Sequence, residues 1–199
     1  MRIQSILAVL LALLALLACS PRDFLTRRLA TDLISLSPAF RAPQHFTVET
    51  GIVSNQNYVA PENLVLEHHG WISITPTRCS PGLSPPPCWD VQLTPAGVDT
   101  IHALVPAEQA GRSSLEFPVA RRELVGVTGI TKDGSQAEVD FIWKWVPLNE
   151  VGAALYSADL RYTSSVGFRH YDDGWRIAAT VPRPATTLDD ALKNAEPIQ

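Results

Sequence analysis

The sequence predicts an α+β fold in which short helices accompany an antiparallel sheet of about four strands. In the second half of the chain, alternating apolar and polar residues are typical of half-buried strands, and Asp-Gly turns join them into hairpins. In the first half, apolar residues recur at helical spacing after serine, threonine or proline residues that are typical of helix N-termini. We therefore expect an N-terminal helix, a small helix-and-hairpin unit, and then a sheet with one short helix.

Composition limits the classes of protein to which the chain can belong. It has 199 residues, of which 46% are hydrophobic and 18% charged, which is ordinary for a globular protein of one domain or two small ones. Its formal net charge of -4 argues against nucleic acid as a partner, because nucleic-acid-binding surfaces are basic.

The first element is an apolar segment at the N-terminus. Arg2 precedes an uninterrupted apolar or small run at residues 6–18, which is too short for a comfortable membrane span and typical of a signal peptide over residues 1–18. The run ends in Leu16-Leu17-Ala18-Cys19, which resembles the lipobox of bacterial lipoproteins. An ordinary secretory signal with an incidental cysteine is the alternative.

The lipobox resemblance implies a lipid anchor. Diacylglycerol would be attached to Cys19, the chain cleaved before it, and the new terminus acylated, palmitate being a typical acyl chain. Several acyl chains anchor a protein stably in a lipid bilayer. Ser20, where an aspartate would be the usual inner-membrane retention signal, favours the periplasmic face of the outer membrane.

A helix is expected directly after the anchor. Ser20 and Pro21 form a helix start, and four leucines share one face up to Pro38: Leu25, Leu29, Leu33 and Leu36. Three arginines could face lipid phosphates or could simply be solvated: Arg22, Arg27 and Arg28.

The helix-and-hairpin unit follows. A strand is expected at residues 44–53, a helix from Pro61 to Gly70, strands at 71–75 and 89–93, and a helix after Thr94-Pro95. The order Leu66-Glu67-His68-His69-Gly70-Trp71, hairpin, Leu93-Thr94-Pro95-Ala96-Gly97 resembles the wing segment of winged-helix proteins. The resemblance implies a winged-helix-like module for protein contact within a region 19–105; an unrelated helix and hairpin is the alternative.

Two cysteines remain once Cys19 is set aside. Cys79 and Cys88 flank a proline-rich loop, and an exported chain permits disulfides, so we expect them to pair. The alternative is a redox or metal-binding thiol pair. Two features argue against it: the spacing of the two cysteines is not Cys-x-x-Cys, and no nearby histidine has zinc-like spacing.

A β-rich region is expected at residues 115–181, beyond a turn-rich linker at 106–114. A hairpin turns at Asp133-Gly134, and its return strand alternates cleanly up to Trp145. A short helix at 149–155 and a second hairpin around Asp173-Gly174 complete it. Residues 182–199 read as a flexible tail with a weak helix at 188–195.

Few residues suggest chemistry. His68-His69 could bind metal, but adjacent helical residues do not share a face. Glu138 and Asp140 could form an acid pair or could be solvated strand charges, and Ser164-Ser165 lacks any nucleophile-elbow context. We therefore predict no catalytic residue, no metal site and no cofactor.

Aromatic residues suggest ligand binding more strongly than the polar residues suggest catalysis. Trp143, Trp145 and Trp175 could line a wall for a glycan, peptide or lipid, or could form the core of the sheet.

We therefore expect a non-enzymatic envelope lipoprotein that binds a protein partner or supports assembly. A small-ligand-binding or glycan-binding lipoprotein is the alternative, and a hydrolase is a third class.

Overall fold

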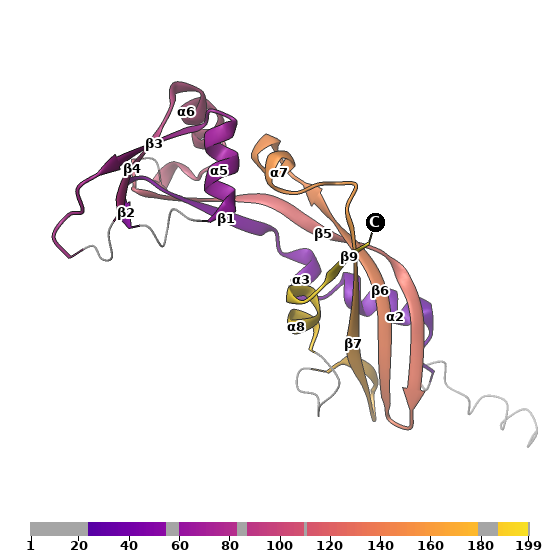
Figure 1. Ribbon diagram of the computed structural model, residues 1–199. Coiled ribbons are helices and arrows are strands. Elements are labelled where there is room, and N and C mark those ends of the chain that lie inside the picture. The colour runs from indigo at the N-terminus through magenta and orange to yellow at the C-terminus, as the bar shows by residue number, and fades with distance from the viewer. Residues whose placement is uncertain (1–23, 55–59, 83–86, 110, 179–186, 199) are drawn as a thin grey trace, which may run out of the picture. The chain divides into compact units, whose positions relative to one another are not determined.

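The computed structural model describes residues 24–54, 60–82, 87–109, 111–178 and 187–198 (Figure 1). The chain divides into two compact units. Unit 1 comprises Met1–Ala39, Leu124–Trp143 and Arg161–Gln199; unit 2 comprises Phe40–Glu123 and Lys144–Leu160. Each unit combines separate stretches of sequence, whereas the regions expected from the sequence, 19–105, 115–181 and 182–199, are consecutive.

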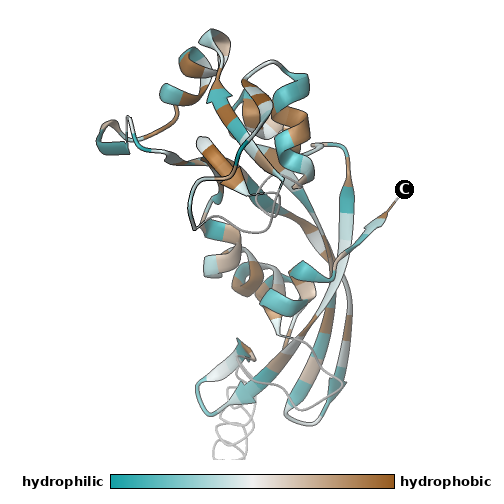
Figure 2. Cartoon of the chain, turned by 60° about the vertical axis from the view of Figure 1, so that its left-hand side comes forward, coloured by the Kyte–Doolittle hydropathy of each residue, from teal (hydrophilic) through white to brown (hydrophobic). Residues whose placement is uncertain are grey.

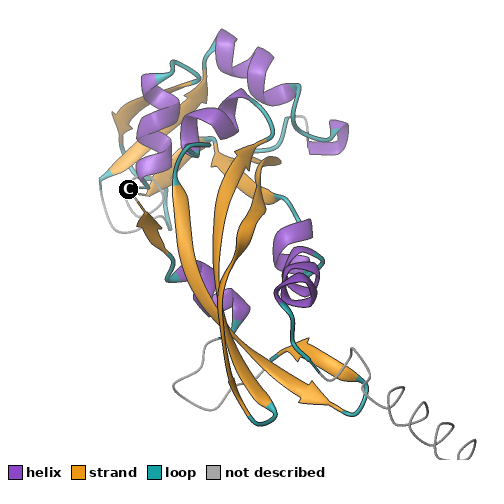
Figure 3. Cartoon of the chain, turned by 90° about the vertical axis from the view of Figure 1, so that its right-hand side faces the viewer, coloured by secondary structure: helices purple, strands orange, loops and turns teal. Residues whose placement is uncertain are grey.

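The expected α+β fold with a winged-helix-like unit and about four antiparallel strands is wrong, because the described chain is mostly sheet (Figure 3). One antiparallel sheet has the strand order β1-β5-β6-β7-β8, with β9 also paired to β7, and a second has the order β2-β4-β3. The helices are short, and β5 (Ser114–Asp133) alone runs for 20 residues. The expected linker ends where β5 begins.

The N-terminal helix is shorter than expected and buries a different face. Helix α2 (Arg27–Ser35) begins behind Thr26, whose Oγ1 accepts a hydrogen bond from the Leu29 amide at 3.1 Å. Its buried residues are Ala30 and Ile34, whereas Leu36, expected on the buried face, is 56% exposed. The short helix α3 (Pro38–Arg41) follows, and Ser20 lies outside the described residues.

The single strand expected at 44–53 is two strands in two sheets. Strand β1 (Gln44–Glu49) pairs with β5, and β2 (Gly51–Ser54) pairs with β4 (Cys88–Leu93). The chain changes sheet at Gly51, whose φ of +87° is a conformation that favours glycine.

The segment that resembles a wing has the expected order of elements. Helix α5 (Pro61–His68) ends before Gly70, strands β3 (Ile72–Thr77) and β4 pair, and α6 (Pro95–His102) begins behind Thr94, whose Oγ1 accepts from the Gly97 amide at 3.0 Å. A Cβ on Gly97 would lie 1.7 Å from the carbonyl oxygen of Trp71, so only glycine allows α6 to pack there.

This segment does not form a separate winged-helix-like unit because its core is shared. Its buried residues Leu66, Ile72, Val91 and Ile101 belong to one cluster with residues of β1, β5 and helix α7 (Glu150–Leu155): Val48, Leu115, Phe117, Val119 and Val151. Helix α7 lies close against β5, where a Cβ on Gly152 would come within 1.8 Å of the Val119 carbonyl oxygen.

The Asp-Gly hairpin is confirmed. Strand β5 turns into β6 (Gln136–Pro147) through Gly134, whose φ is +56°. Along β6 the buried residues are the five expected ones: Ala137, Val139, Phe141, Trp143 and Trp145. Figure 2 shows hydrophobic and hydrophilic residues interleaved along the long strands.

The last elements of unit 1 complete its sheet. Strand β7 (Arg161–Tyr171) pairs with β8 (Gly174–Ile177) through the expected second hairpin. The C-terminal residues are not a tail: α8 (Leu188–Lys193) buries Leu188, Ala191 and Leu192, and β9 (Glu196–Ile198) pairs with Arg161–Thr163 of β7. Among the described residues, no helix is long and apolar enough to cross a membrane.

Candidate functional site

The expected lipid-attachment residue Cys19 lies outside the described residues, but the folded body starts close to it. The described chain begins at Phe24, five positions after Cys19. Leu25 is already buried, and Thr26 caps α2. A chain anchored at Cys19 would therefore have four residues, 20–23, between its anchor and the first described residue.

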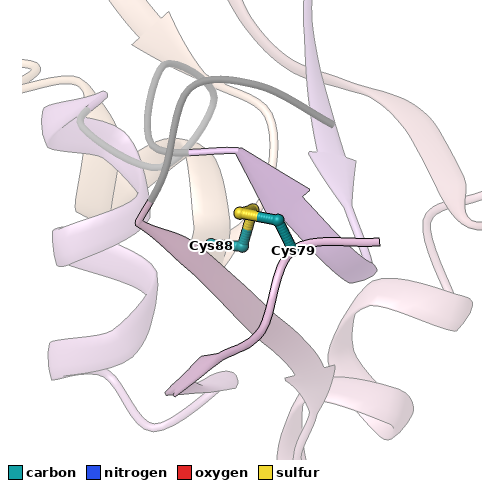
Figure 4. The surroundings of a disulfide bond; sticks show 2 residues. All are labelled: Cys79 and Cys88. Carbon is teal, nitrogen blue, oxygen red and sulfur yellow. A yellow bond between two sulfur atoms is a disulfide. The ribbon is translucent and has the colours of Figure 1, made fainter. Parts of the chain in front are cut away.

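The predicted disulfide is confirmed. Cys79 and Cys88 are joined by an S–S bond, with their Cα atoms 5.0 Å apart (Figure 4). The bond links the segment after β3 to the first residue of β4, next to the pairing of Thr77 with Cys88. Both sulfur atoms are joined to each other in this structure, so neither is free to bind a metal ion.

The three tryptophans are buried rather than displayed. In unit 1, Trp143 is 2% exposed and stacks on Tyr162 with ring centres 4.6 Å apart, while Trp175 is 5% exposed and lies edge-on to His170. In unit 2, the faces of Trp145 are occupied by neighbouring side chains: the Arg122 guanidinium is 4.6 Å from its ring centre and the Tyr156 ring 4.7 Å. These rings belong to the core, and no exposed aromatic wall forms from them.

The histidine pair also packs against neighbouring rings. The His69 ring stacks on Trp71 with ring centres 4.7 Å apart and planes inclined by 13°, and the His68 ring is edge-on to His69. Within the described ranges, no group of three or more histidine, cysteine, aspartate or glutamate side chains is placed to hold a metal ion. Packing of His69 accounts for the position of this pair.

The two carboxylates of β6 lie on its exposed face. The Glu138 Oε1 accepts a hydrogen bond from the Ser165 hydroxyl at 2.9 Å. Asp140 lines a polar depression of about 290 Å³ together with Thr163, Ser165, Asn194 and Glu196. Asp140 and Glu196 thus share one depression, whereas Glu138, the expected partner of Asp140, is not among its described lining residues.

A larger cavity in unit 1 is mainly apolar. It measures about 500 Å³ and lies beside α2 and α8, where its lining includes Leu33, Pro38, Ile177 and Leu188, with Arg176 and Asp189 among its charged residues. None of the three tryptophans proposed from the sequence as ligand contacts lines it.

The most unusual surface of unit 1 is one edge of β5. Strand β1 pairs with β5 only from Ser114 to Ala120, and the other neighbour of β5 is β6. Beyond Ala120, the second edge of β5 therefore has no partner strand among the described residues. We call residues 124–131 of this strand, all in unit 1, the open edge.

The open edge lacks the usual protections of an edge strand. Its sequence Leu-Val-Gly-Val-Thr-Gly-Ile-Thr contains no charged residue and no proline, which are the common devices that prevent edge pairing. Val125 is 45% exposed. One side chain of the described residues reaches the backbone there: the Arg27 guanidinium donates to the Thr128 carbonyl oxygen at 3.1 Å. Backbone donors and acceptors along this edge are thus available to an incoming strand.

Sequence reasoning missed the open edge. The uncharged run was visible, but which strand ends a sheet depends on where β1 stops pairing, and that is a long-range property. Comparison with known proteins adds no family, since no family model, curated protein or solved structure matches the chain.

Proposed function

We propose that the chain is a cell-envelope lipoprotein, anchored through acylated Cys19, whose open edge binds an extended strand of another envelope protein. The observation that carries the proposal is the run of eight uncharged residues along an unpaired strand edge. Strand addition to such an edge is a common way for one protein to recognise another, because main-chain hydrogen bonds supply affinity and side chains supply specificity. The proposed role is non-enzymatic.

Two observations support the cellular location in this proposal. The sequence Leu16-Leu17-Ala18-Cys19 resembles a lipobox, and Ser20 favours the periplasmic face of the outer membrane over the inner membrane. The Cys79–Cys88 disulfide fits an exported protein, since disulfides persist in oxidising compartments.

The anchor is tested by labelling cells with radioactive palmitate. The wild-type chain should take up label and sediment with membranes, and an inhibitor of lipoprotein signal peptidase should cause its precursor to accumulate. Cys19→Ala should abolish the label. A Cys19→Ala chain that kept the label, or a wild-type chain that took up none, would disprove the anchor.

The binding edge is tested by affinity capture of the anchored chain and its partners from cells. Val125→Lys places a charge on the open edge, at a side chain that is already 45% exposed, so the fold should tolerate it. Leu64→Lys makes the same change at a residue of α5 that is 53% exposed and serves as the matched control. We expect Val125→Lys to reduce recovery of the partner about tenfold, equivalent to about 1.4 kcal/mol, and Leu64→Lys to leave it unchanged.

Hydrogen exchange then identifies the mode of binding. Bound partner should slow exchange of amides within residues 124–131, while amides of Ser114–Ala120, already covered by β1, should change little. Equal partner recovery with both lysine variants would contradict the proposal. Dimerisation of the purified chain through the same amides would assign the edge to a second copy instead.

The alternative of a glycan-binding or peptide-binding groove beside the tryptophans has less support. It requires exposed ring faces, whereas Trp143, Trp145 and Trp175 are all at most 9% exposed.

A further inference from the structure

Two strand turns meet at one end of unit 1. The β5–β6 turn contains Gly134, and the β7–β8 turn contains Asp173 and Gly174. The His170 amide donates to the Ser135 carbonyl oxygen at 2.8 Å, which joins β7 to the β5–β6 turn. Figures 1 and 3 both draw the two turns at the same end of the long strands.

The beginning of the described chain lies at this end as well. The Lys132 ammonium is 5.4 Å from the Phe24 ring centre and 5.0 Å from the Trp175 ring centre, so it holds Phe24 beside β8. Phe24 is 56% exposed. Five residues of extended chain span at most about 18 Å, which limits how far an anchor at Cys19 could be from Phe24.

Two arginines face each other across the second turn. Arg169 of β7 and Arg176 of β8 are direct partners in the antiparallel register, and both are exposed. Like charges at directly opposed positions destabilise a sheet. Their guanidinium carbons lie 5.7 and 5.5 Å from the ring centre of Tyr171, which is 40% exposed. Arg176 is also paired with Asp173.

A phosphate group is the anion that this arrangement fits best. Guanidinium groups bind phosphate oxygens through paired hydrogen bonds. Exposed aromatic rings beside them suit the boundary between headgroups and acyl chains, where aromatic residues are enriched. Tyr171 supplies such a ring beside the two arginines, and Phe24 supplies one beside Lys132 at the same end of unit 1.

We infer that this end of unit 1 rests on the membrane surface, where Arg169 and Arg176 bind the phosphate groups of anionic phospholipids. We name Phe24, Lys132, Arg169, Tyr171 and Arg176 the turn cluster. The inference rests on the proposed anchoring at Cys19, which would keep the turn cluster within reach of headgroups. Asp133, Asp172 and Asp173 lie in the same turns, and their carboxylates oppose the attraction to anionic headgroups. The acyl chains therefore supply most of the affinity for the membrane, and the turn cluster sets the orientation of unit 1 on it.

The arginines expected from the sequence to face lipid are not the ones assigned this role. Arg27 donates to the Thr128 carbonyl oxygen and is therefore engaged by the sheet. Arg22 lies outside the described residues, and Arg28 is an exposed residue of α2.

The test uses the chain that begins at Cys19, coupled through that thiol to a maleimide lipid in vesicles. Coupling is selective because Cys79 and Cys88 are joined to each other. Phenylglyoxal then modifies accessible arginines, and peptide mass spectrometry gives the rate at each one. Arg161 is the internal control, because it is exposed and lies at the opposite end of β7.

On vesicles containing phosphatidylglycerol, Arg169 and Arg176 should react about fivefold more slowly than on pure phosphatidylcholine, and Arg161 should react equally on both. Equal rates at Arg169 and Arg176 on the two kinds of vesicle would overturn the inference. Equal protection of the uncoupled chain by millimolar inorganic phosphate would also overturn it, because the ligand would then be free phosphate. Chemical coupling needs no acylation in cells, so failure here is distinct from failure of palmitate labelling.

Discussion

At the scale of single residues, a hydroxyl in the core of unit 1 connects three elements. Ser164 of β7 accepts a hydrogen bond from Trp143 Nε1 of β6 at 3.1 Å and donates to the Ala191 carbonyl oxygen of α8 at 2.9 Å. Ser164 is 8% exposed, so both bonds are shielded from water. A buried hydrogen-bonding group that loses its partner costs more free energy than an exposed one.

We therefore expect Ser164→Ala to lower the free energy of unfolding by about 1–3 kcal/mol. The neighbouring Ser165→Ala removes a hydroxyl that bonds to exposed Glu138 and should change it by less than about 0.5 kcal/mol. Urea titration followed by tryptophan fluorescence measures both. Equal effects at the two serines would show that the buried network does not stabilise unit 1.

The pattern of apolar and polar residues predicted correctly which side chains are buried where a single periodicity dominated the segment. Strict alternation in β6 identified all five of its buried residues, because a strand with one solvated face has a single register. The leucine pattern of the N-terminal helix predicted the wrong buried residues, since Ala30 and Ile34 are buried while Leu36 is exposed. Ser164 gave no signal, because its partners come from distant parts of the chain.

At the scale of elements, the β3–β4 hairpin is closed by a covalent bond. Cys88 is 1% exposed and pairs in register with Thr77, and its bond to Cys79 closes a loop with a sequence separation of 9. The closed loop restricts the unfolded chain, and a loop of this size is expected to stabilise the fold by about 2.5 kcal/mol.

Replacing both cysteines, as Cys79→Ala with Cys88→Ala, should lower the free energy of unfolding by about that amount. Adding reductant to the wild-type chain is the matched control and should reproduce most of the loss. A free-thiol titration of the chain carrying Cys19→Ala should find no thiol before reduction. Two free thiols in the exported chain would contradict the disulfide in cells.

The C-terminal helix is a structural element of unit 1. Composition suggested a flexible tail, but Leu188, Ala191 and Leu192 of α8 are buried, and β9 adds to β7. Proline content lowered the helical signal, whereas tertiary burial decides whether so short a helix is stable.

Leu192→Ala should accordingly destabilise the protein by about 2–5 kcal/mol, because it removes a buried side chain from the packed face of α8. Leu36→Ala, at a leucine 56% exposed, is the matched control and should change stability by less than about 0.5 kcal/mol. Thermal unfolding of the two variants distinguishes them. Identical melting temperatures would mean that α8 is not held in the core.

At the scale of the whole molecule, the sequence predicted most turns and helix starts but not which strands pair with one another. The Asp-Gly turn, the Thr94-Pro95 start and the disulfide depend on neighbouring residues and were predictable. The open edge and the turn cluster depend on which strands pair, and β5 and β6 contribute residues to both units. Long-range pairing of this kind leaves no local pattern in the sequence.

The most direct test of the proposed function is photo-cross-linking in living cells. A photoreactive amino acid replaces Val125 on the open edge or, as a control, Leu64 on α5, in chains that keep Cys19. We predict that position 125 cross-links to a protein other than this chain, that Leu64 does not, and that Cys19→Ala weakens the cross-link. No cross-link at position 125 above the level at position 64, or a cross-link only to a second copy, would contradict the account.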